Sequence, residues 1–236
     1  MISVRFIETL ISLITLFVAY LITFTLANYT RAWTAKKMGD STPESLGFLT
    51  LNPLAHVDPI GVLLLLFTGI GWGKHVPLNP YAIFGKHKKL KLVLVYCSQV
   101  FAYIGAALVS LILLIKFFGL KVLKLAMPMV FAGKIFLPEF TALYPHSSSF
   151  ILAIAFIMVA IIYMSLFWAV ISLIVNLFDL ILILYYPHLY AQKERDYTLI
   201  LAPLLIMFLF AYQIRVYLIY AVVIVGSIIA QLLGMQ

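Results

Sequence analysis

Long apolar runs separated by short polar segments dominate this sequence. The hydrocarbon core of a bilayer needs about 20 apolar residues to cross it, and four stretches reach that length: Phe6 to Asn28, Leu92 to Ile115, Ser147 to Tyr186 and Tyr197 to Gln236. The charged residues inside them are Glu8, Asp179 and Arg215. The pattern predicts a polytopic membrane protein of about five or six transmembrane helices.

The last two runs are longer than one crossing requires. At about 1.5 Å per residue each would extend roughly 60 Å as a straight helix, so each is expected to break, tilt or fold back. We expect Arg215 to lie at an interface and to divide the final run into two short spans. The chain is thus predicted to be a single membrane domain over 1–236, with a core over about 6–187 and a helical hairpin over about 197–236.

The segment from Gly39 to Gly61 differs from the rest of the chain. Gly, Pro, Asn, Asp and Thr cluster there around a short apolar alternation from Gly47 to Pro53, a pattern typical of turns and short strands. Ile60 to Ile70 is apolar but too short to span, which favours a re-entrant or interfacial element. Lys116 to Phe140 mixes lysines with apolar residues and predicts an amphipathic, interface-lying segment. The expected fold class is all-α, with a small strand-containing re-entrant insertion.

Composition excludes a water-soluble domain. The chain is 65% hydrophobic and 10% charged, with a mean hydropathy of +1.13, whereas soluble domains carry roughly 25% charged residues. Half of the 16 basic residues fall between Arg31 and Lys91, so this region is expected to face the cytoplasm. Four lysines would lie at the anionic leaflet: Lys86, Lys88, Lys89 and Lys91. They would act either as an orientation signal or as a lipid-binding cluster. We expect no nucleic-acid partner.

Metal-binding patterns are absent from the sequence. Cys97 is the only cysteine, and no two of the five histidines are spaced at i, i+3 or i+4, so neither a cysteine-based zinc site nor a histidine pair on one helical face is expected. We expect no cofactor and no metal.

A resemblance rests on several segments in a fixed order: Ala32 to Ala35, Gly39 to Thr42, Leu46-Gly47, Leu49 to Gly61, Gly71 to Lys74 and Val76 to Pro80. These segments resemble the compact bacterial site-2 protease family of intramembrane zinc metalloproteases. The resemblance implies that the core over about 6–187 is site-2-protease-like, and that the protein is a multi-pass protein of a bacterial inner membrane.

The zinc signature of that family has no counterpart here. The family carries His-Glu-x-x-His on the helix before the Gly-Asp pair, where the two histidines bind zinc and the glutamate activates a water molecule. Counting back from Ala32 places Ala27, Asn28 and Arg31 at these positions. Ala27 has no donor atom, Asn28 cannot act as a base, and Arg31 stays protonated and repels a dication.

Two further parts of the family's catalytic apparatus also differ. The family's third ligand is an aspartate, and the comparable stretch here, Asn176 to His188, places either Leu184 or Pro187 at that position. The family's Ala-Gly-Pro-x-x-Asn motif corresponds to Cys97 to Ala102. The sequence therefore predicts a protein that is not an enzyme: an inactive metalloprotease relative, or pseudoprotease, without catalytic residues.

The expected function is that of a scaffold or complex subunit that binds other integral membrane proteins. The family's substrate groove suggests an edge strand that accepts an extended peptide, which needs no metal. The candidate partner-binding residues are Leu49, Thr50, Leu51, Asn52, His56 and Asp58. For His56 and Asp58 there is a simpler interpretation, in which both side chains satisfy backbone groups of a buried turn.

Arg31 and Asp179 are costly residues for apolar spans. We expect them to form a buried ion pair where the metal centre of an active relative would lie, although Arg31 could instead snorkel to the interface. Two alternative functions stay open: an active zinc protease with rearranged ligands, and a small transporter that uses polar residues within the spans, such as Gln99, Asn176 and Asp179.

Overall fold

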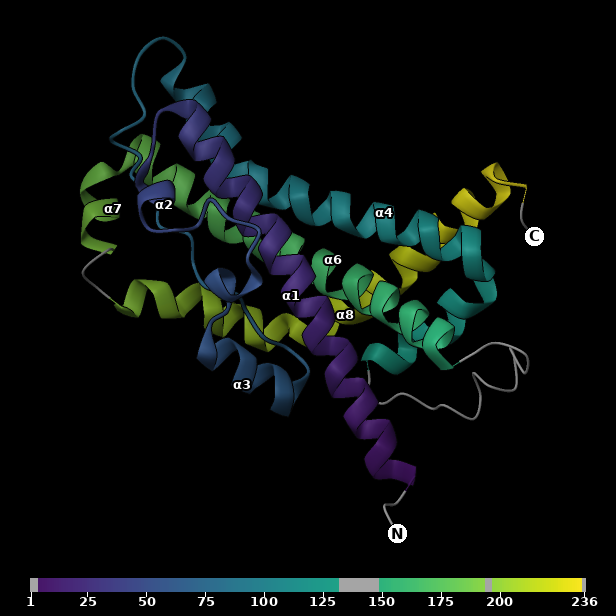
Figure 1. The fold of residues 1–236 in the computed structure, drawn as a ribbon. Coiled ribbons are helices and arrows are strands. Elements are labelled where there is room, and N and C mark those ends of the chain that lie inside the picture. Colours follow the sequence, from purple (N-terminus) through teal and green to yellow (C-terminus); the bar gives the residue numbers. More distant parts are fainter. Residues whose placement is uncertain (1–3, 132–148, 194–196, 235–236) are drawn as a thin grey trace.

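The computed structural model describes residues 4–131, 149–193 and 197–234, and these ranges are helical with irregular connections (Figure 1). The helices are, in chain order, α1 (Val4–Met38), α2 (Thr42–Ser45), α3 (Pro59–Thr68), α4 (Lys88–Phe131), α6 (Ser149–Tyr185), α7 (Pro187–Lys193) and α8 (Tyr197–Leu232), with a 3₁₀ turn over Pro53–His56 between α2 and α3. The all-helical prediction is confirmed for these residues.

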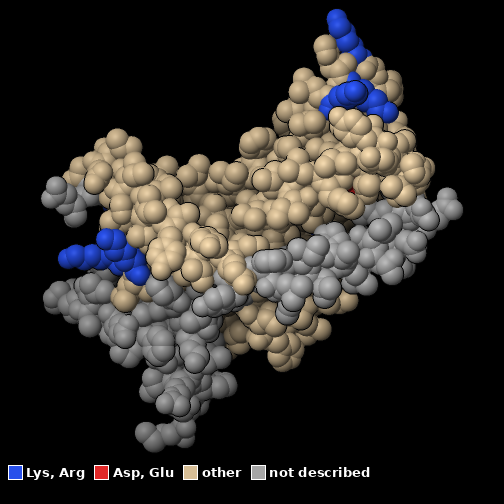
Figure 2. All heavy atoms as spheres, turned by 180° about the vertical axis from the view of Figure 1, so that it is seen from behind, with Lys and Arg blue, Asp and Glu red and all other residues tan. Residues whose placement is uncertain are grey.

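Among the residues that the structure describes, three helices are long and apolar enough to cross a membrane, over Leu10–Met38, Lys88–Met127 and Ile151–Tyr185. Two shorter apolar helices lie over Pro59–Thr68 and Val216–Leu232. On the face shown in Figure 2, Lys and Arg side chains gather at two separate ends, and the described surface between them is almost entirely uncharged. Such a distribution is typical of a protein whose middle faces lipid.

The core forms where α6 packs against α1 and α4. Aromatic rings from the three helices meet there: the ring centroid of Phe24 in α1 lies 6.1 Å from that of Tyr103 in α4 and 5.5 Å from that of Trp168 in α6. Fully buried alanines of α1 and α6 let the helices approach closely, as in other membrane bundles. α6 is thereby the most enclosed of the three candidate spans.

The two longest apolar runs form unbroken helices over their described residues. Residues 197–232 form one continuous helix, so the predicted hairpin with a division at Arg215 is wrong. Arginine is a good helix former, and neither glycine nor proline lies between Pro203 and Gly226 to end the helix. For the same reason α6 continues unbroken over 37 residues.

α4 changes direction at Gly119, whose φ of 76° and ψ of 171° are not helical. Beyond this bend the helix is amphipathic as expected, since Lys121 and Lys124 are exposed while Val122 and Leu123 are fully buried. Its apolar face packs into the protein core, however, so the described part of Lys116 to Phe140 does not depend on a lipid interface for burial. The remainder of that segment lies outside the described residues.

The predicted strands are also absent from Gly47 to Asn52. Within the described ranges the one β-type contact is an isolated antiparallel bridge between Val57 and Gly73. The Asn52 carboxamide accepts a hydrogen bond from the backbone N–H of Leu54, at 3.1 Å. Such local bonds favour turns over strand pairing, and Pro53 cannot donate to a ladder.

Residues 57–74 form a loop that contains α3 and contacts α1 near both of its ends. Asp58 caps α3 by accepting from the Gly61 N–H at 2.8 Å, and Gly69 ends the helix with a φ of 72°. The Tyr20 hydroxyl donates to the Trp72 carbonyl at 2.9 Å and accepts from the Asp58 N–H at 3.1 Å. One side chain of α1 therefore fastens both ends of this loop.

Glycines allow the two limbs of the loop to touch. A Cβ on Gly61 would collide with the Trp72 carbonyl oxygen, and one on Gly73 would lie 2.5 Å from the Phe24 ring. The contact at Gly61 is with backbone, which cannot rotate away. Close packing of the loop therefore depends on the absence of a side chain at this position.

We predict that Gly61→Ala lowers the free energy of unfolding in detergent by about 1–3 kcal/mol, the usual cost of overpacking. Gly105→Ala is the matched control, because a Cβ on Gly105 meets nothing within 4 Å, and it should leave stability unchanged or slightly raised. Equal stability of the two variants, measured by thermal unfolding, would contradict the close approach.

Candidate functional site

The three positions that the resemblance places at the zinc signature lie on the buried face of α1. Ala27, Asn28 and Arg31 are 0%, 1% and 3% exposed. Their spacing of i, i+1 and i+4 places Ala27 and Arg31 one turn apart on the same side of the helix. The structure therefore brings these residues together in the interior, and their surroundings decide what the site can do.

Gln99 of α4 is the centre of this site. Its Nε2 donates to the Asn28 Oδ1 at 2.9 Å, and its Oε1 accepts from an Arg31 terminal nitrogen, Nη1, at 2.7 Å. Asn28 Nδ2 donates in turn to the Lys74 carbonyl at 2.8 Å. We call Asn28, Arg31, Gln99 and the Lys74 carbonyl the Gln99 network; it connects α1, α4 and the segment that follows the 57–73 bridge.

The side chain of Arg31 is surrounded by α4 and α6. Its guanidinium carbon lies 5.3 Å from the centroid of the Tyr96 ring, a cation–π distance. The Asp179 carboxylate of α6, 6% exposed, acts electrostatically on the guanidinium. With 3% of its surface exposed, Arg31 lies inside the protein, which favours internal partners over snorkelling. The direct ion pair between Arg31 and Asp179 stays a prediction.

The residues at the signature positions do not fit a zinc ion. Ala27 offers no donor, both polar atoms of Asn28 are already hydrogen-bonded, and Arg31 adds a positive charge one turn away. In the described ranges no three His, Cys, Asp or Glu side chains cluster in a way that could hold a metal. Several candidate donors lie outside the described side chains: Glu8, Glu139, His146, Glu194 and Asp196.

The second candidate region is the turn that contains His56 and Asp58. His56 is 1% exposed, and its Nε2–H donates to the Thr50 carbonyl at 2.8 Å while its Nδ1 has no hydrogen-bond partner. Burial lowers the pKa of His56, with the bond to Thr50 acting in the opposite direction. These contacts, together with the cap that Asp58 forms, are those of side chains that hold a turn.

The segment that precedes this turn is held in place by hydrogen bonds, but two of its apolar side chains are not covered by the rest of the protein. Leu51 and Leu54 expose 60% and 74% of their surface. The backbone groups of Leu49 and Leu51 form no hydrogen bond with another backbone group in the described chain, whereas Thr50 and Asn52 are engaged by the turn. Strand pairing within the described chain therefore does not use the backbone polar groups of Leu49 and Leu51.

Sequence reasoning singled out Ala27, Asn28 and Arg31 but missed the central role of Gln99. Its polar side chain inside an apolar span was the available signal. The pairing itself joins residues 68 and 71 positions apart in the sequence, and no periodicity or spacing rule connects such distant positions.

Comparison with known proteins identifies one informative relative. The chain is 34% identical over 113 residues to the "Putative zinc metalloprotease YwhC" of Bacillus subtilis (strain 168), covering 46% of this chain and 49% of the relative. The chain thus aligns with about half of that protein's length. No family model and no solved structure matches the chain. The finding supports a zinc metalloprotease-like relationship and fits a bacterial source.

This relative contradicts one prediction. From the substitutions at Ala27, Asn28 and Arg31 we expected a protein that is not an enzyme. The relative's name points to a protease rather than to a protein without enzymatic activity. The residues at positions 27, 28 and 31 determine only what that one site can bind. They give no information about possible metal ligands elsewhere in the chain.

We predict that Asp179→Asn lowers the free energy of unfolding by about 3–5 kcal/mol, because it removes one partner of a buried pair. The control is Glu44→Gln, which breaks the pair of Lys36 and Glu44, whose side chains are 46% and 40% exposed; such a pair contributes about 0–1 kcal/mol. If both variants unfold in detergent at the same temperature as the parent, Asp179 does not compensate the Arg31 charge.

Proposed function

We propose that this chain is a membrane-embedded relative of the site-2 zinc metalloproteases that binds an extended segment of another membrane protein along residues 48–54. The observation that carries the proposal is the combination, on one fastened segment, of free backbone groups at Leu49 and Leu51 with exposed apolar side chains at Leu51 and Leu54. Backbone groups and alternate side-chain contacts are the two elements of peptide recognition by strand addition.

The segment is preorganised although it is not a strand. Its C-terminal end is held by the His56 bond to Thr50 and by the Val57–Gly73 bridge. Its N-terminal side follows α2 and begins at Phe48, which is 3% exposed and donates its N–H to the Pro43 carbonyl. A rigid segment loses little conformational entropy on binding, which favours affinity.

A membrane environment strengthens the argument. A partner segment that is extended near the bilayer leaves its own N–H and C=O groups without helical partners, at a cost of several kcal/mol for each unsatisfied group. The free groups of Leu49 and Leu51 can satisfy some of them. The occupant that fits is therefore a membrane protein segment that is locally unwound, rather than a regular transmembrane helix.

Zinc-dependent hydrolysis of a peptide bond is the second candidate function, and the metalloprotease relative is the observation that favours it. Because the signature positions do not fit a zinc ion, such activity requires ligands from other parts of the chain. Binding of a peptide at residues 48–54 would then serve as substrate binding, so the two candidates share this step.

The test uses a photo-crosslinking amino acid at position 54 and, as a control, at position 46, since Leu54 and Leu46 are both exposed (74% and 57%). The probe is a synthetic single-span peptide whose helix is interrupted by Gly-Pro. We predict that it crosslinks to position 54 several-fold more than to position 46. Leu51→Pro, which removes a backbone donor, should reduce the yield, while Leu51→Ala should reduce it less.

Equal yields at positions 54 and 46, or a yield that Leu51→Pro leaves unchanged, would overturn the binding proposal. The same samples are analysed for zinc and for cleaved peptide. Stoichiometric zinc together with cleavage that stops on chelation would establish the second candidate, whether or not the peptide binds along residues 48–54.

A further inference from the structure

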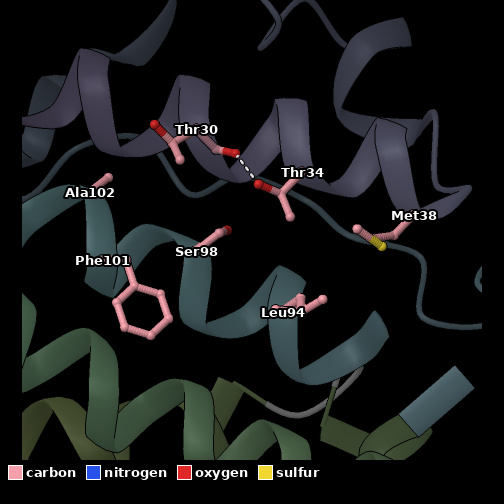
Figure 3. Close-up of a pocket in the computed structure, with 7 residues that line it drawn as sticks. All are labelled: Thr30, Thr34, Met38, Leu94, Ser98, Phe101 and Ala102. Carbon is pink, nitrogen blue, oxygen red and sulfur yellow. Dashed lines mark hydrogen bonds between the residues drawn. The ribbon is translucent and has the colours of Figure 1, made fainter. Parts of the chain in front are cut away.

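A groove of about 400 Å³ lies between the antiparallel helices α1 and α4 (Figure 3). Thr30, Thr34 and Met38 line it from α1, at spacings of four residues. Leu94, Ser98, Phe101 and Ala102 line it from α4. Eight residues of helix correspond to about 12 Å, so the groove is a short channel along the two helix axes.

The groove presents no free hydrogen-bond donor to an occupant, although three of its residues carry hydroxyl groups. Thr30 donates to the Leu26 carbonyl, Thr34 to the Thr30 carbonyl and Ser98 to the Val95 carbonyl, at 2.7–2.8 Å. Each hydroxyl therefore donates its proton to its own helix, as is common for Ser and Thr in membrane helices. An occupant finds no free donor in the channel, which favours a hydrocarbon chain.

One end of the groove is basic. Met38 and Leu94 mark this end, and Ala35, Leu92 and Met38 pack in one cluster, so the C-terminus of α1 and the N-terminus of α4 lie together there. Lys91 precedes Leu94 by one turn on α4, and Lys37 follows Thr34 by one turn on α1, so both lysines continue the groove-lining faces. The nearby acid Glu44 is paired with Lys36. The charge balance at this end therefore favours an anionic group.

We propose that the groove binds one acyl chain of an anionic phospholipid, with the phosphate at Lys37 and Lys91. The groove lies at the basic end of the candidate spans Leu10–Met38 and Lys88–Met127, the depth at which the first carbons of an acyl chain lie below a headgroup. A regular helix, about 10 Å across with its side chains, contacts the rims of such a channel without filling it. A single acyl chain, in contrast, is narrow enough to enter the channel.

The experiment uses the full chain in nanodiscs and two lipid probes with a photoreactive diazirine on the acyl chain, one a phosphatidylglycerol and one a phosphatidylcholine. Peptides are mapped by mass spectrometry. The phosphatidylglycerol probe should label 30–38 and 94–102 in preference to the phosphatidylcholine probe, by a factor of about five for each lysine that contacts the phosphate.

Two sets of variants test binding of the acyl chain and binding of the headgroup separately. Ser98→Trp fills the groove and should abolish labelling of 94–102, whereas Val109→Trp, at a position 58% exposed on the same helix, should not. Ala102→Phe is a second, smaller filling variant in case Ser98→Trp does not fold. Lys37→Gln with Lys91→Gln should remove the preference for phosphatidylglycerol, and Lys116→Gln with Lys124→Gln, beyond the other end of the groove, should retain it.

Labelling that is equal for the two probes would overturn the phosphate assignment. Labelling of 94–102 that survives both Ser98→Trp and Ala102→Phe would show that the chain lies elsewhere on the surface. Loss of lipid labelling when a single-span peptide is added would show that the groove is a protein-binding surface, and it would also overturn the proposal.

Discussion

Gln99 supplies hydrogen bonds to two polar side chains of α1 that have no access to water. Inside a membrane-crossing bundle, the positive charge of Arg31 and the carboxamide of Asn28 are tolerable only if the protein itself satisfies them. Gln99 forms hydrogen bonds with both side chains, and Asn28 also donates a hydrogen bond to the Lys74 carbonyl. This constraint determines the rotation of α1 about its axis and the distance between α1 and α4.

The rest of the structure follows from that arrangement. With the polar face of α1 turned towards α4, Tyr20 lies where it can fasten both limbs of the 57–73 loop, and the loop in turn holds residues 48–56. The adjacent face of α1, with Thr30 and Thr34, lines the groove between α1 and α4. The proposed peptide-binding segment and the proposed lipid groove are thus on different sides of one helix whose orientation is set by a buried network.

The similarity to a zinc metalloprotease and the residues of the network have to be considered together. The similarity supports a protease-related protein, while Ala27 has no donor atom and the side chains of Asn28 and Arg31 are hydrogen-bonded to Gln99, so the three residues offer no ligand set. A position that would demand metal ligands in the family pattern is filled here by uncharged donors, acceptors and one cation. The proposed peptide binding is compatible with both observations, because it requires no particular group at these three positions.

Sequence patterns predicted the apolar helices, a short apolar element over 60–70 that does not span, and the unusual character of 39–61, since each follows from local composition. These predictions were wrong where the structure depends on contacts between residues far apart in the sequence, or on the absence of a residue that ends a helix. The unbroken α8, the lack of strands at 47–52 and the partnership of Gln99 with residues about 70 positions away are of this kind. The groove was not predictable either, because it requires the relative placement of two helices.

The most direct test of the Gln99 network is a double-mutant cycle of Asn28→Ala and Gln99→Ala, with unfolding in detergent followed for the parent, the two single variants and the double variant. If the two side chains are bonded in the interior, the two effects are not additive, and a coupling energy of about 0.5–3 kcal/mol is expected. A coupling energy indistinguishable from zero would contradict the network, and with it the orientation of α1 on which both proposed binding surfaces depend.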